Sequence, residues 1–338
     1  MSSQQPASEQ PRTDRAGELA ERPRQRRLPD FFIAGHPKSG TTALYTMLRA
    51  HPQIFMPSLK EPLFFSSDMR LRFATPRSGR IPQTLEEYLA LFAGAEPEQL
   101  LGEASSSYLW SRTAAAAIAE AQPSARIIAV LREPASFLRS LHLQFMQIHV
   151  EAQGSLRKAL ALEPARREGR HIPPTSHRPQ LLLYSEHVRY VEQLRRYETL
   201  FAPEQLLVLI YDDFLADNEG TVRAILRFLG VDDSAPVKAQ QANPTVEVRS
   251  QRLHRLTRSV ALGQGPLARV LHPLMARLSP RQLARLVAVR DRLIVRGPGS
   301  ADESLMLELR RRYKPEVAAL SEHLGRDLVT LWGYDRLD

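Results

Sequence analysis

The feature that most constrains the fold is a series of short apolar runs that do not alternate with polar residues. These runs occupy residues 30–35, 100–103, 126–132 and 206–211, and a plausible helix follows each of them. Apolar runs without alternation predict strands buried on both faces, and strands separated by helices predict a parallel sheet. We therefore expect an α/β fold, a three-layer sandwich with a central parallel sheet flanked by helices, with ligands beyond the carboxyl ends of the strands.

The expected helices and domain limits follow from the same pattern. Helices are expected at residues 41–51, 133–149, 184–201 and 217–229, the last with Asp217 as its N-cap. The first 28 residues are rich in Gln, Pro, Ser and Arg and bury too little apolar area to fold, so we expect a disordered tail. Residues 29–338 are expected to form one domain, with a helical C-terminal region from about residue 251.

The composition narrows the chemistry and the setting of the chain. It has no cysteine, which excludes disulfides and thiolates, and its ten histidines show no paired metal motif, so no metal is expected. No apolar run approaches the ~20 residues that cross a bilayer, and the N-terminus lacks the apolar core of a signal peptide. The sequence therefore predicts a cytoplasmic protein.

The formal charge of +9 comes from one segment. Arg252–Arg296 contains ten arginines and one acid, Asp291. A helix after Ser279 and Pro280 would carry much of this charge on one face, at Arg281, Arg285, Arg292 and Arg296. This face is expected to attract an anionic or polar-lipid ligand, or to make a peripheral contact with a membrane.

Residues 35–42, GHPKSGTT, lie between the first expected strand and the first expected helix. At such a junction, backbone N–H groups and the helix dipole attract an anion. An ATP or GTP P-loop has its lysine directly after the second glycine, whereas Lys38 precedes that glycine here. The pattern predicts a P-loop-like fold whose ligand is not a magnesium-bound triphosphate. Its candidate binding residues are Lys38, Ser39, Gly40, Thr41 and Thr42.

Three linked motifs resemble those of sulfotransferases that use 3′-phosphoadenosine 5′-phosphosulfate (PAPS). PKSGTT resembles their 5′-phosphosulfate loop, and residues 60–65, KEPLFF, resemble the Lys-Glu-x-x-Phe-Phe element of the heparan-sulfate and related bacterial branch. Arg132, with Ser140 eight residues later, resembles the element that binds the 3′-phosphate. The resemblance covers about residues 30–230 and implies PAPS as sulfuryl donor, adenosine 3′,5′-bisphosphate as product and no metal. A lysine suits this reaction because it can neutralise the bridging oxygen without a metal ion.

Glu61 is the best candidate for the general base, with Lys38 as the second catalytic residue. An acceptor hydroxyl must lose its proton as the new sulfur–oxygen bond forms, and a carboxylate within hydrogen-bond reach can accept it. The resemblance assigns the same role to this glutamate. His36 and His142 are rival bases, and an ion pair between Glu61 and Lys60 is the alternative interpretation.

The acceptor is predicted only by class: a hydroxyl of a small molecule, a glycolipid or a carbohydrate. The heparan-sulfate branch has a lysine where this chain has Ala104, so acceptor handling should differ from that of the polysaccharide enzymes. Aromatic residues near the strand ends could line an acceptor pocket or simply form core, namely Phe64, Phe65, Tyr108 and Trp110. Candidates for a C-terminal 3′-phosphate loop are Arg249 and Arg296-Gly297.

Two other functions would each explain part of the sequence. A P-loop kinase of small metabolites would explain the loop but not the displaced lysine, and it would require magnesium. A basic protein that binds nucleic acid or a membrane surface would leave the loop, Glu61 and Arg132 unexplained, so no nucleic-acid partner is expected. Asp212 and Asp213 resemble a metal-binding acid pair only superficially, and we expect them to cap the next turn.

Overall fold

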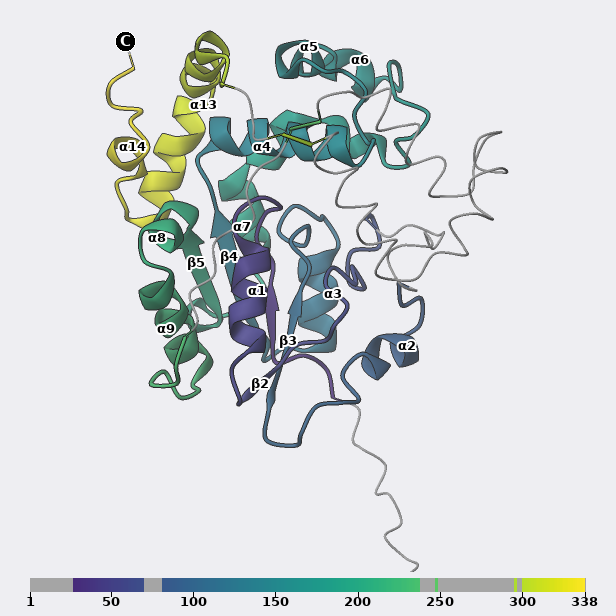
Figure 1. Cartoon of the computed structure of the whole chain (residues 1–338), viewed down its shortest axis with the longest axis vertical. Helices are drawn as coiled ribbons and strands as arrows, with labels where there is room; N and C mark the ends of the chain where they lie inside the picture. Colours follow the sequence, from purple (N-terminus) through teal and green to yellow (C-terminus); the bar gives the residue numbers. More distant parts are fainter. Residues whose placement is uncertain (1–26, 70–80, 238–246, 249–294, 297–299, 338) are drawn as a thin grey trace, which may run out of the picture.

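The structure of the protein is a computed structural model that describes residues 27–69, 81–237, 247–248, 295–296 and 300–337. Its centre is a sheet of parallel strands in the order β2-β3-β1-β4-β5 (Figure 1). In chain order the strands are β1 Phe31–Ile33, β2 Ile54–Phe55, β3 Leu100–Ala104, β4 Arg126–Leu131 and β5 Leu206–Ile210. The four strands predicted from the apolar runs are confirmed. β2 has only two residues and is too short to produce such a run.

Helices cover both faces of this sheet, as the apolar strands require. The α-helices are α1 Thr41–Arg49, α2 Leu85–Ala90, α3 Ala114–Ala121, α4 Pro134–Gln147, α5 Leu156–Ala161, α6 Glu163–Arg167, α7 Tyr190–Glu198, α8 Tyr211–Ala216, α9 Asn218–Leu229, α13 Glu303–Leu324 and α14 Leu328–Leu331. Three 3₁₀-helices are also described, η1 Pro179–Leu182, η2 Tyr184–Val188 and η3 Pro203–Gln205.

Alternate residues of the central strands enter two separate hydrophobic cores. Phe32 packs with residues of α3, α4, α7 and α13 on one face of the sheet. Phe31 and Ile33 point the other way and pack with residues of α1 and α9. Because each face is buried under helices, the predicted three-layer α/β sandwich is confirmed.

The helix boundaries follow the sequence signals closely, with one exception. Glu133 caps α4 by accepting hydrogen bonds from the backbone of its first turn, and Asp217 caps α9 in the same way. The single helix predicted over residues 184–201 is wrong in its first part. That stretch is the 3₁₀-helix η2 followed by α7, because Arg189, with φ −78° and ψ 62°, leaves the helical conformation between them.

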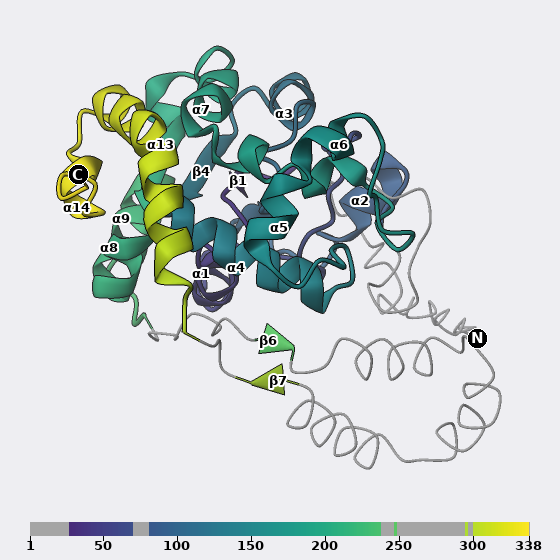
Figure 2. The same cartoon turned by 90° about the horizontal axis from the view of Figure 1, so that it is seen from above.

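The C-terminal segment docks on the body of the domain through α13 and α14. α13 lies against α4 and α7, as Figure 2 shows from above. Arg326 forms a bidentate ion pair with Asp213 at 2.5 and 2.8 Å, and the indole N–H of Trp332 donates to Asp212 at 3.0 Å. The two aspartates therefore anchor the end of the chain, and the prediction that they cap the next turn is wrong.

The predicted arginine-rich face can be compared with the structure at one position. β6 Glu247–Val248 pairs with β7 Val295–Arg296 in an antiparallel arrangement, and β6 lies close to α4. Arg296 thus lies in a strand, and its prediction as part of a helix face is wrong. Arg249, Arg281, Arg285, Arg292 and Gly297 lie outside the described residues, as does most of the predicted tail. In the described part of the chain, no helix is long and apolar enough to cross a membrane.

Candidate functional site

One pocket at the carboxyl edge of the sheet brings together three of the segments that the sequence singled out. Its volume is ≈ 210 Å³. It lies beside β1. From β1 the chain passes first to β2 and β3 on one side of that strand, and then crosses to β4 and β5 on the other side. Such a switch point is where ligands bind in open α/β sheets. The pocket is lined by Pro37, Lys38, Gly40, Thr41, Thr42, Ala43, Lys60, Glu61, Ser106, Arg132, Gln144 and Tyr211.

The backbone of the loop after β1 is held in a shape that few residues adopt. Gly40 has φ +84°, a conformation that favours glycine, and a Cβ there would lie only 3.0 Å from the ring of Phe214. Lys38 also has a left-handed backbone, with φ +63°. Gly40 caps α1 without a side-chain hydrogen bond, so the first N–H groups of α1 are not satisfied by a capping side chain.

Lys38 and Arg132 make the loop end of the pocket strongly cationic. The guanidinium of Arg132 donates to the carbonyl of Lys38 at 2.7 Å and lies 4.8 Å from the centre of the Tyr211 ring. Burial, together with the nearby Arg132, lowers the pKa of Lys38. Within the described residues, neither cation is paired with a carboxylate. Two unneutralised cations beside the start of a helix favour a bound anion.

Glu61 lies across the pocket with its carboxylate fixed by several donors. The N–H and the hydroxyl of Ser106 each donate to it at 2.8 Å, and Lys60 pairs with it at 2.6 Å. Its backbone has φ +63°, and its N–H donates to the carbonyl of Ala104 at 2.9 Å. The ion pair that was the alternative interpretation is therefore present. It does not exclude catalysis, because the Glu61 side chain is 32% exposed and lines the pocket.

The two rival bases are both buried. His36 is fully buried, bonds to Gln193 at 2.7 Å, and has its pKa lowered to about 3, mainly by burial. His142 is buried against Tyr184, and burial lowers its pKa as well. Neither histidine lines the pocket, so the geometry favours Glu61 as the base.

Of the predicted 3′-phosphate pair, one residue lines the pocket. Arg132 lines the pocket, but Ser140 on α4 is buried and does not. Gln144, one turn further along α4, is the residue of that helix that reaches the pocket, and Ser136 is the serine that accepts a hydrogen bond from Arg132, at 3.2 Å. Helical spacing from Ser140 could have indicated both residues, because positions four apart share a face. The role of Ser140 stays a prediction.

Behind Glu61 lies a second carboxyl group that the sequence analysis did not single out. Glu103, in β3, is fully buried and accepts hydrogen bonds from Tyr88 and Tyr108 at 2.9 and 2.8 Å. Burial raises its pKa to about 7, and the negative charge of Glu61 adds to that rise. Tyr108 and the stacked Phe64 and Tyr88 are thus part of the core around this group, and they do not line the pocket.

Comparisons with known proteins agree with this geometry. The model of the sulfotransferase family matches residues 29–235, which is more than half of the chain. Mouse carbohydrate sulfotransferase 15 is 28% identical over 261 residues, which are 62% of this chain and 45% of that protein. The human protein of the same name is 34% identical over 162 residues, 36% of this chain and 28% of that one. The chain thus spans less than half the length of these curated relatives.

A solved structure extends the likeness to nearly the whole chain. The crystal structure of a sulfotransferase from Alicyclobacillus acidocaldarius matches with a TM-score of 0.63 and 26% identity, covering 90% of this chain and 98% of that one. The fold is an open parallel α/β sheet with a ligand pocket at the carboxyl ends of its strands. The protein belongs to the sulfotransferase family.

Proposed function

We propose that the protein transfers a sulfuryl group from PAPS to a hydroxyl of a small-molecule, glycolipid or carbohydrate acceptor. The observation that carries this proposal is a single pocket in which two unneutralised cations, Lys38 and Arg132, face an ordered carboxylate, Glu61. The curated relatives are named carbohydrate sulfotransferases, and this supports a carbohydrate as the acceptor. The cytoplasmic location and the limits of the domain stay predictions from the sequence.

The residues present fit the donor. Its phosphosulfate is an anion, and the loop offers Lys38, Arg132 and the first N–H groups of α1. The hydroxyl of Ser39 is buried and has no hydrogen-bond partner among the described residues, but Ser39 does not line the pocket, so its part in binding stays a prediction. We propose that Lys38, Arg132 and the first N–H groups of α1 hold the donor. No metal is part of the proposal.

The same residues account for the chemistry of transfer. When the acceptor oxygen bonds to sulfur, the bond from sulfur to the bisphosphate oxygen breaks, and negative charge develops on that oxygen. Lys38 is proposed to neutralise it, while Glu61 accepts the proton of the acceptor hydroxyl. Lys60 also lines the pocket. It supplies a cation near the site, although this chain has Ala104 where the heparan-sulfate branch has a lysine.

The proposal is tested first by binding and then by transfer. Adenosine 3′,5′-bisphosphate should raise the melting temperature of the protein in the presence of EDTA, since protein groups alone balance its charge. Labelled sulfate should then pass from PAPS to at least one member of a panel of sugars, phenols, nucleosides and lipids. Stabilisation by ATP with magnesium, without any by the bisphosphate, would instead support a kinase.

A further inference from the structure

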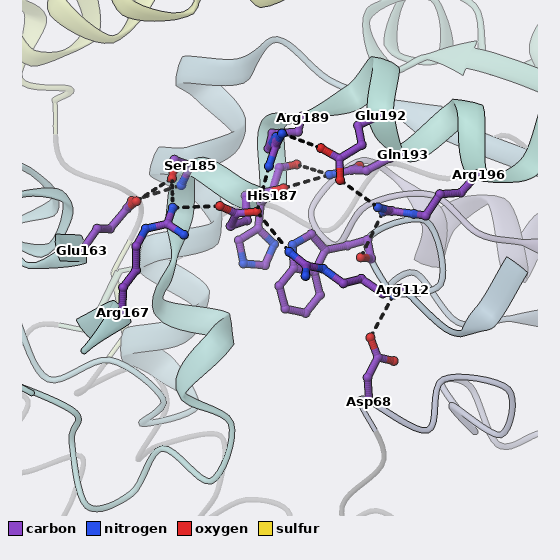
Figure 3. Close-up of polar contacts among 12 residues, drawn as sticks. Asp68, Arg112, Glu163, Arg167, Ser185, His187, Arg189, Glu192, Gln193 and Arg196 are labelled. Carbon is purple, nitrogen blue, oxygen red and sulfur yellow. Dashed lines mark hydrogen bonds and ion pairs between the residues drawn. The ribbon is translucent and has the colours of Figure 1, made fainter. Parts of the chain in front are cut away.

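A second pocket, of ≈ 310 Å³, lies outside the proposed reaction centre. It is formed where the segment after β3 meets the segment that runs from η2 into α7. Figure 3 shows Arg189 and Arg196 on the two sides of Glu192, with Arg112 below them and Asp68 beyond Arg112. It shares no lining residue with the first pocket. Its lining is Asp68, Trp110, Arg112, Gln180, Leu183, Glu186, Arg189, Glu192, Gln193 and Arg196.

An aromatic side chain in this pocket is fixed in orientation. Trp110 stacks on the ring of His187, with ring centres 4.4 Å apart and planes 9° from parallel. Burial lowers the pKa of His187 to about 4, so the ring beneath the indole is neutral near pH 7. Because stacking on His187 holds the uncharged indole of Trp110 in place, the indole is a suitable surface for the apolar C–H face of a ring-shaped ligand.

The charges around Trp110 balance. Among the described residues that line the pocket, three arginines face three carboxylates. Glu192 pairs with Arg189 at 2.7 Å and with Arg196 at 3.3 Å. Glu186 lies 3.6 Å from Arg112 and 3.4 Å from Arg189, and it also pairs at 2.7 Å with Arg167, which does not line the pocket. Such a pocket offers N–H donors and carboxylate acceptors side by side without a surplus of either sign.

This balance decides between two kinds of ligand. A sulfated or carboxylated ligand would gain from the arginines and lose against the acids, whereas a hydroxyl can donate to a carboxylate and accept from a guanidinium. We propose that the second pocket binds an uncharged, hydroxyl-rich ring, that is, a neutral sugar. Its assignment as part of the acceptor rests on the proposed function.

Two chain segments connect this pocket to the reaction centre. Residues 61–68 and 105–113, here called the connecting wall, line the first pocket at Glu61 and Ser106 and the second at Asp68 and Trp110. Glu61 and Asp68 are separated by at most about 25 Å, since a chain advances at most ~3.6 Å per residue.

Hydrogen bonds hold the two segments of the wall together along its length. They run from the N–H of Leu63 to Ser105, from the N–H of Phe65 to Tyr108, from Ser67 to Thr113 and from Ser111 to Asp68. The position of the second pocket relative to Glu61 is therefore fixed. Under the proposed function, an acceptor long enough to follow the connecting wall would place one ring in the second pocket and its reacting hydroxyl near Glu61.

The test uses the fluorescence of Trp110 in the full chain. The protein has two tryptophans, and Trp332→Phe leaves Trp110 as the single reporter. The probes are the uncharged disaccharides maltose, lactose and cellobiose, each compared with glucuronic acid and glucose 6-sulfate. The expected result is a saturable change in fluorescence with at least one neutral disaccharide, weaker binding of both anions, and little dependence on salt.

Glu192→Gln supplies the matched variant, because it keeps the size of the side chain and removes one negative charge. Neutral-sugar affinity should fall by about tenfold, and preference should move toward the anions. Glu219→Gln is the control: Glu219 forms the same i,i+4 pair with an arginine on α9, outside both pockets. Equal effects of the two variants, tighter binding of the anions by the unsubstituted pocket, or no response to any neutral disaccharide would overturn the proposal.

The result is separable from that of the proposed function. Sugar binding is measured without donor and without transfer, whereas bisphosphate binding reports on the first pocket. A protein that binds the bisphosphate but no neutral sugar would keep the proposed function and lose the second pocket as a sugar site. Trp110→Ala and Trp110→Phe lack the fluorescent reporter, so their sugar binding is measured by calorimetry; binding that is abolished by the first and weakened by the second would support the site even if the bisphosphate failed to bind.

Discussion

The two pockets are built from the same kinds of side chain and differ in charge. Among the described residues, the first is lined by three cations, Lys38, Lys60 and Arg132, with one carboxylate, Glu61. The second is also lined by three cations, but it has three carboxylates. The first therefore favours an anion and the second an uncharged polar ligand. The number of cations that line each pocket, three in both, or the net charge of +9 for the chain, would not have distinguished them.

Removing a cation from the first pocket should give the largest effect. Lys38→Ala is expected to lower turnover by about a thousandfold and to weaken bisphosphate binding, because Lys38 meets the donor before and during transfer. Steady-state kinetics and calorimetry measure both. Neutral-sugar binding in the second pocket should be unchanged, and exposed Lys158→Ala on α5 is the control. A loss of sugar binding in Lys38→Ala would show that the pockets are not separate.

Removing the single carboxylate of the first pocket should separate binding from chemistry. Glu61→Gln can keep hydrogen bonds with Ser106 but cannot accept a proton. Turnover is expected to fall by about a hundredfold or more, with bisphosphate affinity unchanged or slightly higher, because the pocket becomes more cationic. Near-normal turnover at saturating substrates would point to another base.

The buried carboxyl group behind the connecting wall should make stability depend on pH. Because Glu103 has a pKa raised to about 7, it keeps its proton in the folded protein after the unfolded chain has released it. The unfolding free energy should therefore fall as pH rises from about 4.5 to 7, by on the order of 3 kcal/mol. In Glu103→Gln this fall in the unfolding free energy should be absent. Denaturant titrations across that range measure it, and equal slopes for both proteins would contradict the assignment.

Removing Arg132 should have the smallest of these effects. Arg132→Ala is expected to weaken bisphosphate binding by about tenfold and to relieve product inhibition, with a lesser change in turnover at saturating donor. Exposed Arg195→Ala, on α7, tests for a general effect of charge. A fall in turnover as large as that of Lys38→Ala would place Arg132 on the reacting group.

The sheet and the first pocket were predictable because their signals are local. Each strand of the central sheet except β2 lies in a short, mainly apolar run, and Lys38 and Glu61 lie in short motifs of fixed spacing. The structure then adds what those motifs do not contain, namely that Ser106 holds the carboxylate of Glu61 and that Ser140 lies outside the pocket. Such contacts depend on how separate segments meet, which spacing along one segment does not encode.

The second pocket could not be found from the sequence for the same reason. Asp68, Trp110 and Arg196 come from three segments, and Arg196 lies on α7, which the sequence analysis merged with η2 into one helix. Trp110 was considered only as part of a group of aromatics, most of which turned out to be core. The equal numbers of cations and carboxylates become apparent only when α7 and the connecting wall are placed together.

The left-handed backbone at Lys38 and Glu61 has a consequence for engineering this protein. In that conformation glycine avoids a steric cost of roughly 1–2 kcal/mol, which offsets the roughly 0.5–1 kcal/mol that glycine loses by making the unfolded chain more flexible. A library sorted only for heat resistance would therefore tolerate or even enrich glycine at both positions. The surviving molecules would be well folded and chemically inert, so melting temperature is a poor guide to whether a redesigned version still functions.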